Sequence, residues 1–489
     1  MYAVFFHFVV IRAPLVEANV PGCRYKNIRG SGILPPRSYP SHTSTHRGCT
    51  APQRQAQLDP AIPETPLLSS ILGFLITLVL LVGFYVVRKP EERSWLMPVA
   101  LLAFLLKAFI MPFYFQWLVY IGDGGFAYAD AGRVHRQAIQ MGEEIVYETA
   151  RITPGWAAVD PGFYQLTAYT YLIFGPNTLI IRFMLIMCIS MSLLYTYRIT
   201  RMYFDEPTAR LAAGLHAFMP APILLSLNHR KDPVVQLIVM FAFYHAMRVF
   251  RQDQGWQKSA FMVIVGLFVV YPFRSGLVLP FIGMMVICFV LANRNALQGI
   301  VLTLITLLSL VVLQLSIPED SRVNLDTYAS RATGKFADSA EFSNTGGLTR
   351  LLRVTGPLDI YKVPFAAVAY MFLPFPPNID GYPVTILSSF LHLVAIFLLP
   401  HMMLGAWSLI RAPDWRLKLP LIVFPTVFLL VLGAVHIGLL RYREIFYPIC
   451  MIWIAIGWRI GTPAALRLIV YVGLLILTIP IYLTRFGFL

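Results

Sequence analysis

The stretch LLSSILGFLITLVLLVGFYVV, residues 67–87, runs for 21 residues without a charged side chain. An α-helix of about 20 apolar residues matches the thickness of the hydrocarbon core of a bilayer. The stretch is followed directly by Arg88 and Lys89, as is typical of the cytoplasmic end of a membrane span. It therefore predicts a transmembrane helix.

The same apolar pattern recurs along the rest of the chain. Of the 489 residues, 57% are hydrophobic and 13% are charged, whereas a soluble domain has about 25% charged residues. We therefore expect an all-α polytopic membrane protein with about twelve transmembrane helices. The further apolar runs are 95–118, 177–197, 209–227, 233–249, 259–273, 276–292, 298–316, 385–409, 419–439, 445–458 and 468–484.

The formal net charge is +15, which in a soluble protein would suggest binding to nucleic acid. Here the basic residues stand in short loops between apolar runs, where they orient helices in the bilayer, so no nucleic-acid partner is predicted. The long polar loops, 119–176 and 317–384, fall on the side whose loops contain fewer Lys and Arg residues, which we expect to be the outer side. The alternating loops expected in the cytoplasm contain Arg88, Lys89, Arg93, Arg198, Arg201, Arg210, Arg248, Arg251, Lys258, Arg411, Arg416, Lys418, Arg459 and Arg467.

Residues 1–65 differ from the remainder, because they are rich in Pro, Ser, Arg and Thr and show no periodicity. We interpret them as a disordered tail or as sequence assigned too far upstream. The transmembrane domain is then 66–489. The histidines along the apolar runs lack paired ligand spacing and are interpreted as helix-packing residues, among them His216, His245, His392, His401 and His436.

The first outer loop begins IGDGGFAYADAGRVHRQA, residues 121–138, and contains Asp123 and Asp130. A carboxylate near the bilayer surface can act as a general base towards a hydroxyl group or ligate a divalent cation. Alternatively, either Asp caps a short helix. We expect amphipathic helices in this loop.

Several polar elements follow in a specific order: Ala138 in the amphipathic segment, PGFYQL at 161–166, FGP at 174–176, Arg182 at a helix start and HRKDP at 229–233. The run from 123 to 250 resembles the GT-C superfamily of membrane glycosyltransferases. The closest branches are bacterial ones related to protein O-mannosyltransferases and aminoarabinose transferases. The resemblance implies a lipid-linked sugar donor.

In that superfamily the catalytic carboxylate is an Asp of the first outer loop, typically in Asp-Glu-x-Tyr-Tyr followed by Ala and Gly. Asp130 matches by its spacing to Ala138 and Gly142, so the resemblance assigns the catalytic role to Asp130, with Asp123 as the alternative. The chain departs from the pattern at Ala131, where a second acid is common. It also departs at 133–134, Arg-Val, where aromatic residues are common.

A second polar cluster is the turn His229-Arg230-Lys231-Asp232. Such charges at the end of a membrane helix are costly unless they reach water or a ligand. In one interpretation Arg230 and Lys231 hold a phosphate while Asp232 orients them. In the other, the turn is an ordinary interfacial loop whose basic side chains snorkel to water.

A third cluster contains Arg441 and Arg443, just before Tyr447-Pro448. The resemblance implies that an Arg here binds the donor phosphate; the alternative is a helix-start anchor. Arg274 is a further candidate, because an Arg between two apolar runs needs a partner. Candidates for the acceptor side of the first loop are Arg133, His135 and Tyr164.

The predicted function is transfer of a sugar from a polyprenyl-phosphate donor to a hydroxyl of a glycan, lipid or protein, on the outer face of a bacterial cytoplasmic membrane. No cofactor motif is present, although a divalent cation can take part. The alternatives are a polysaccharide flippase or transporter and an O-antigen polymerase-like protein. A transporter would place ionisable residues at mid-membrane depth.

Overall fold

The fold is built from α-helices, and the part of the chain that the computed structural model describes contains no strand. The described residues are 67–122, 124–127, 129–146, 161–292, 396–435 and 445–485, with a few positions between 304 and 394. They belong to one unit, Pro60–Leu489. The tail 1–65, the apolar run 298–316 and the loop 317–384 lie outside the described residues almost entirely.

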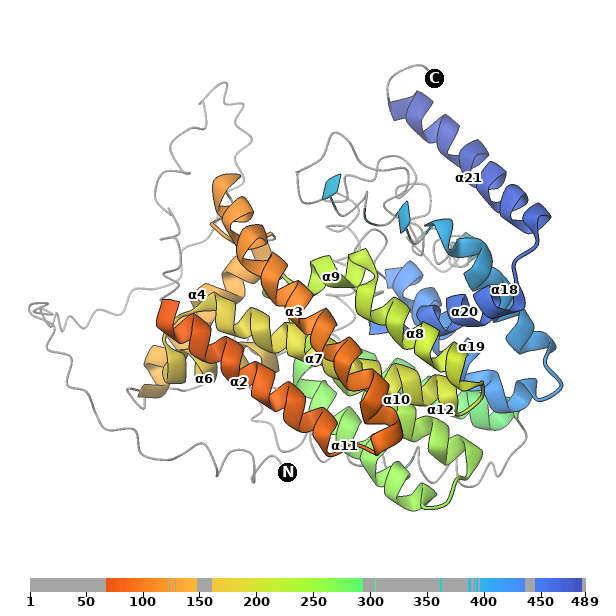
Figure 1. Cartoon of the computed structure of the whole chain (residues 1–489), viewed down its shortest axis with the longest axis horizontal. Coiled ribbons are helices and arrows are strands. Elements are labelled where there is room, and N and C mark those ends of the chain that lie inside the picture. The colour runs from red at the N-terminus through yellow and green to blue at the C-terminus, as the bar shows by residue number, and fades with distance from the viewer. Residues whose placement is uncertain are drawn as a thin grey trace, which may run out of the picture. The chain divides into compact units, whose positions relative to one another are not determined.

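The helices keep the labels of Figure 1. They are α2 (Leu67–Val86), α3 (Pro90–Tyr120), α4 (Ala129–Val146), α6 (Gly162–Phe174), α7 (Thr178–Arg201), α8 (Glu206–Phe218), α9 (Pro220–Ser226), α10 (Asp232–Arg251), α11 (Trp256–Arg274), the 3₁₀ turn η1 (Ser275–Leu277), α12 (Val278–Leu291), α18 (Leu399–Arg411), α19 (Trp415–Val435), α20 (Tyr447–Ile460) and α21 (Ala464–Arg485).

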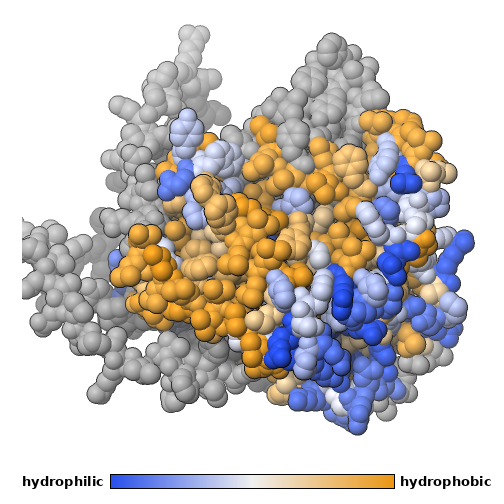
Figure 2. Space-filling model, in the orientation of Figure 1, coloured by the Kyte–Doolittle hydropathy of each residue, from blue (hydrophilic) through white to orange (hydrophobic). Residues whose placement is uncertain are grey.

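Five of the described helical segments are long and apolar enough to cross a membrane: α2, α3, α7, α10, and α11 together with η1. Large apolar side chains of α2 and α3 point outward, among them Leu68, Val79 and Phe109, and Figure 2 shows a broad hydrophobic surface over these helices. Lipid rather than water suits such a surface. The predicted all-α polytopic membrane fold is confirmed, and the number of twelve spans stays a prediction.

At one end of the helices several arginines pair with carboxylates, and Figure 2 shows hydrophilic residues concentrated on one part of the surface. Glu92, at the start of α3, pairs with Arg198 near the end of α7 at 2.6 Å. Asp205 caps the start of α8 and pairs with Arg459 at the end of α20, at 3.2 Å. We call this the basic end.

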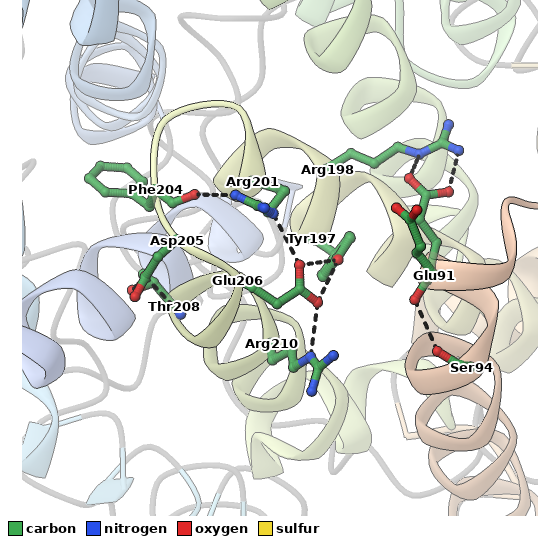
Figure 3. Close-up of polar contacts among 11 residues, drawn as sticks. Glu91, Ser94, Tyr197, Arg198, Arg201, Phe204, Asp205, Glu206, Thr208 and Arg210 are labelled. Atoms are coloured by element: carbon green, nitrogen blue, oxygen red, sulfur yellow. Dashed lines mark hydrogen bonds and ion pairs between the residues drawn. The ribbon is translucent and has the colours of Figure 1, made fainter.

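Figure 3 shows part of the basic end, where the carboxylate of Glu206 accepts hydrogen bonds from three side chains. Tyr197 donates to both oxygens at 2.7 and 2.8 Å. Arg201 and Arg210 donate at 3.0 and 2.9 Å. The predicted cytoplasmic loops therefore do meet at one end of the helices.

The opposite end is formed by the end of α3, by α4 and α6, by the start of α7 and by the turn 227–231. We call it the loop end. Along α7, Arg182 at the loop end and Arg198 at the basic end are 16 residues apart, which is about 24 Å at 1.5 Å per residue. Helices α10 and α11 likewise join the two ends, because Asp232 and Arg274 lie at one and Arg251 and Trp256 at the other.

The apolar run 209–227 differs from the single span expected. The chain leaves the helix at Met219, whose φ of −62° and ψ of 131° are extended, and continues as the separate helix α9. The physical reason is Pro220, because a proline disfavours helical geometry in the residue before it. The break delivers α9 and the turn after it to the loop end.

Candidate active site

Helix α4 forms the centre of the predicted first outer loop, and it is amphipathic as expected. It buries Ala131, Val134, His135 and Ala138 and exposes Arg133, Arg136, Gln140 and Glu143. Asp130 is its second residue, at the helix start. The side chain of Asp130 and the whole of Asp123 lie outside the described residues, so their catalytic roles stay predictions.

His135 faces inward from α4 and is nearly fully buried. Its Nδ1 lies 2.8 Å from the hydroxyl of Tyr171 on α6. Burial, with the nearby charges of Arg136 and Arg182, lowers the pKa of His135 to about 4. The imidazole is therefore neutral near pH 7, where it has one donor and one acceptor nitrogen.

Residues 227–230 of the turn are buried, so Arg230 does not snorkel into water, and Lys231 is half-buried. Asn228 accepts a hydrogen bond from Tyr114 at 3.2 Å, and Arg230 is largely buried. His229 is also buried, and neither ring nitrogen has a hydrogen-bond partner among the described residues. Burial and the nearby Arg182 and His135 hold the pKa of His229 well below its usual value.

Asp232 and Arg274 form an ion pair at the loop end. The Nη1 of Arg274 lies 2.9 Å from the Oδ1 of Asp232, and both side chains are mostly buried. The prediction that Arg274 needs a partner is therefore met by Asp232. This pair ties the start of α10 to the end of α11.

Phe126 joins the first loop to the turn 227–231. Its ring lies 5.2 Å from that of His135 and 6.2 Å from that of His229, between ring centroids. Phe163 on α6 contacts His229 from another side at 5.6 Å. The connection before α4 and helix α6 therefore both contact His229, in the turn after α9.

The other predicted residues are placed as follows. Lys231 and Tyr164 are half-buried, and Arg133 is exposed on α4. Arg441 and Arg443 lie outside the described residues, just before α20. The structure thus brings His135 next to Phe126, which also contacts His229, and pairs Asp232 with Arg274. The third cluster stays a prediction.

Two buried cations were not among the predicted site residues. Arg182 is fully buried at the start of α7 and donates to the carbonyl of Gly125. Lys107 is fully buried in α3, and its Nζ has no hydrogen-bond partner among the described residues. The signal that could have found them is an ionisable residue inside an apolar run, which is costly in a membrane.

A small polar network lies on the helices around His216, which was interpreted as a packing residue. Its Nδ1 lies 2.9 Å from the hydroxyl of Thr196 and its Nε2 lies 2.8 Å from Nε2 of Gln236. Both ring nitrogens therefore have partners, which agrees with that interpretation. Within the described part of the chain, no three His, Cys, Asp or Glu side chains gather as metal ligands.

Residues 159–317, about a third of the chain, match the family described as dolichyl-phosphate-mannose-protein mannosyltransferase. The predicted resemblance to the GT-C membrane glycosyltransferases is confirmed. The matched stretch contains α6 to α12, and with them the turn 227–231 and the pair of Asp232 and Arg274. No curated protein matches the chain.

Among solved structures, the chain is similar to the archaeal oligosaccharyltransferase AglB from Archaeoglobus fulgidus in complex with an inhibitory peptide and a dolichol-phosphate. The TM-score is 0.50 and the identity 14%, over 76% of this chain and 51% of that one. The apo form of the oligosaccharyltransferase from the same organism gives a TM-score of 0.48 and 12% identity, with the same coverage. The likeness to AglB shows a shared fold, and this chain spans about half the length of that protein.

Proposed function

We propose that the protein is a glycosyltransferase that moves a sugar from a polyprenyl-phosphate donor to an acceptor hydroxyl. The observation that carries the proposal is the meeting of two segments distant in sequence. Phe126, which contacts both His135 of α4 and His229, joins the helix whose first turn contains Asp130 to the turn with His229 and Arg230. A base and phosphate-binding cations are the groups that this transfer needs.

In the proposed reaction the acceptor oxygen attacks the anomeric carbon of the donor sugar, and the bond from that carbon to the phosphate oxygen breaks. Asp130 takes the proton of the acceptor hydroxyl. The polyprenyl phosphate leaves with the electron pair, and its added negative charge is stabilised by Arg230 and Lys231. Asp123 is the alternative base, and either carboxylate can instead ligate a divalent cation.

The remaining predicted residues take supporting roles. Arg274, fixed by Asp232, and the pair Arg441 and Arg443 are proposed to contribute to the phosphate site. The dolichol-phosphate bound to AglB supports a lipid phosphate as donor. The acceptor is a glycan, a lipid or a protein, approached from the first loop past Arg133, His135 and Tyr164.

The proposed location of the reaction is the outer face of a bacterial cytoplasmic membrane. Lys and Arg in short loops favour the cytoplasm, and the basic end contains most of them, including Arg198, Arg201 and Arg210. Because the loop end lies about 24 Å away along α7, it would then face outward. The donor lipid tail would lie between helices in the membrane.

The test uses membranes that contain the full-length protein and radiolabelled mannosyl-phosphoundecaprenol as the probe donor. Label that enters the delipidated fraction is measured for Asp130→Asn and Asp123→Asn, with and without EDTA. Loss of a general base predicts a decrease of about 100-fold or more in the Asp130 variant. Glu143→Gln, an exposed carboxylate on the same helix, is the matched control and should transfer normally. Undiminished transfer by the Asp130 variant refutes its role.

One observation favours the transporter alternative. Lys107 is a buried cation within a membrane-spanning helix, about 26 Å along α3 from Pro90 at 1.5 Å per residue, and ionisable residues at such depth often mark transport pathways. Lys107→Met separates the two functions. A transferase should keep its activity on the labelled donor in this variant, whereas a flippase should lose movement of a fluorescent polyprenyl-phosphate sugar across vesicles.

A further inference from the structure

The connection between α3 and α4 requires glycine at several positions. Gly122, Gly124 and Gly125 have φ values of 88°, 56° and 84°, a region that residues with a Cβ atom rarely adopt. A Cβ atom at Gly125 would overlap the ring of Phe115 on α3. The backbone therefore packs directly against an aromatic ring just before α4 begins.

Arg182 reaches this connection from another helix. Its Nη2 donates to the carbonyl oxygen of Gly125. Its guanidinium lies over the rings of Phe115 and Phe126, at 5.0 and 6.0 Å from their centroids. One side chain from α7 thus contacts the residues on both sides of the glycine turn.

Placing Arg182 here is energetically costly. The side chain is fully buried, and its Nε and Nη1 have no hydrogen-bond partner among the described residues. Burying a donor without a partner forfeits its hydrogen bonds to water, and the loss is larger for a charged group. A neutral apolar residue would fill the space between the two rings without that cost.

The contact is transmitted to the candidate active site. Phe126, which Arg182 covers, also contacts His135 of α4 and His229 of the turn 227–231. Gly125 precedes Asp130 by only five residues. An error in the backbone at Gly125 would therefore move the start of α4 relative to the turn that contains Arg230.

We propose that Arg182 is a positioning residue, which holds the glycine turn and thereby sets the position of the first turn of α4 for the reaction. This inference rests on the proposed function, because the reaction for which Arg182 positions the first turn of α4 is the proposed sugar transfer. The competing role is direct binding of an anionic group of the donor through Nε and Nη1. The observations favour positioning, because the hydrogen bond and both ring contacts described for the side chain are with the turn and its flanking rings.

The experiment compares Arg182→Lys with Gly125→Ala, which disturbs the same turn from its other side, and with the double variant. Lysine keeps the charge but lacks the planar fork that lies between two rings. With mannosyl-phosphoundecaprenol as donor, each single variant should lower kcat by about 100-fold, as a misplacement near 1 Å does. The KM for the donor should change by less than about threefold. The double variant should be little worse than either single one, because the two act on one contact.

Hydrogen–deuterium exchange of the purified full chain gives a readout that is independent of transfer. Amides of 124–138 should exchange faster in both variants, while those of α10 and α11 stay unchanged. A higher donor KM with unchanged kcat in Arg182→Lys, or unchanged exchange and kcat together, overturns the proposal. If the wild-type protein transfers no mannose, mannose is excluded as the donor sugar of the proposed function. Faster exchange in 124–138 would then still support the anchoring of the turn by Arg182, and unchanged exchange would overturn it.

Discussion

The two ends of the helices differ in how deeply their charged side chains are buried. At the basic end Glu206 is matched by Arg201 and Arg210, and Arg198 makes two hydrogen bonds to Glu92. These groups are partly exposed to solvent. At the loop end His229 and parts of Arg182 are buried without hydrogen-bond partners in the described part of the chain.

The difference supports the proposal that the reaction takes place at the loop end. Paired, solvated charges contribute little to stability and serve to orient helices. Buried and incompletely paired groups lower stability, so their presence points to a functional constraint.

The largest effect is expected from Asp232→Asn at the loop end. The substitution removes the charge that lies 2.9 Å from the buried guanidinium of Arg274. Loss of one partner from a buried pair typically costs about 3–5 kcal/mol. The midpoint of thermal unfolding in detergent should fall accordingly. The double variant Asp232→Leu with Arg274→Met should recover most of that loss, and a single variant as stable as the wild type would contradict the importance of the pair.

A second test concerns the crossing of α18 and α20, near the basic end. A Cβ atom at Gly457 would collide with the carbonyl oxygen of His401, and one at Gly405 with that of Trp453. A backbone carbonyl can move only if its whole helix shifts, so Gly457→Ala should lower the free energy of unfolding by about 2–3 kcal/mol. Gly473→Ala on α21, where nothing lies within 4 Å of the added atom, is the control and should be neutral or slightly stabilising.

Much of the fold could be predicted from the sequence, because apolar runs in lipid leave helices as the available solution. The ends of α2, α7 and α10 fall within a few residues of the predicted runs. The break at Met219 was missed, although Pro220 was visible, since the run stays apolar across it. The site was harder. His229 and Arg230 were recognised as a polar turn, but the partnership of Asp232 with Arg274 depends on helix packing, which hydropathy does not encode.

The pH dependence of stability should distinguish the ends. His135 has a pKa of about 4 and His229 one well below its usual value, whereas an unfolded histidine titrates near 6.5. As pH falls below about 6.5 the unfolded chain therefore takes up protons that the folded protein does not, and stability decreases by at most about 1.4 kcal/mol per pH unit for each histidine. For His135 the decrease ends near pH 4.

Asp205 at the basic end titrates in a lower window. Its pKa is lowered, chiefly by the hydrogen bond from Thr208, so its contribution is present above the unfolded value near 3.9 and is lost only below it. Unfolding midpoints between pH 7 and pH 4.5 should therefore fall less steeply in His135→Gln than in the wild type. Asp205→Asn should leave the slope of the unfolding midpoint against pH unchanged in that range. If His135→Gln also left this slope unchanged, His135 at the loop end would not be the cause of the pH dependence.

The smallest effect is expected from Glu92→Gln. The substitution breaks the pair with Arg198, but both side chains are partly exposed, at 16% and 22%, and Arg198 retains the ring of Tyr244 at 5.7 Å. Exposed pairs contribute about 0–1 kcal/mol, so the unfolding midpoint should shift slightly, less at high salt, and transfer activity should persist. A loss as large as that of Asp232→Asn would mean that charge at the basic end is also held out of water. The contrast between the ends would then lie in hydrogen-bond completeness and not in solvation.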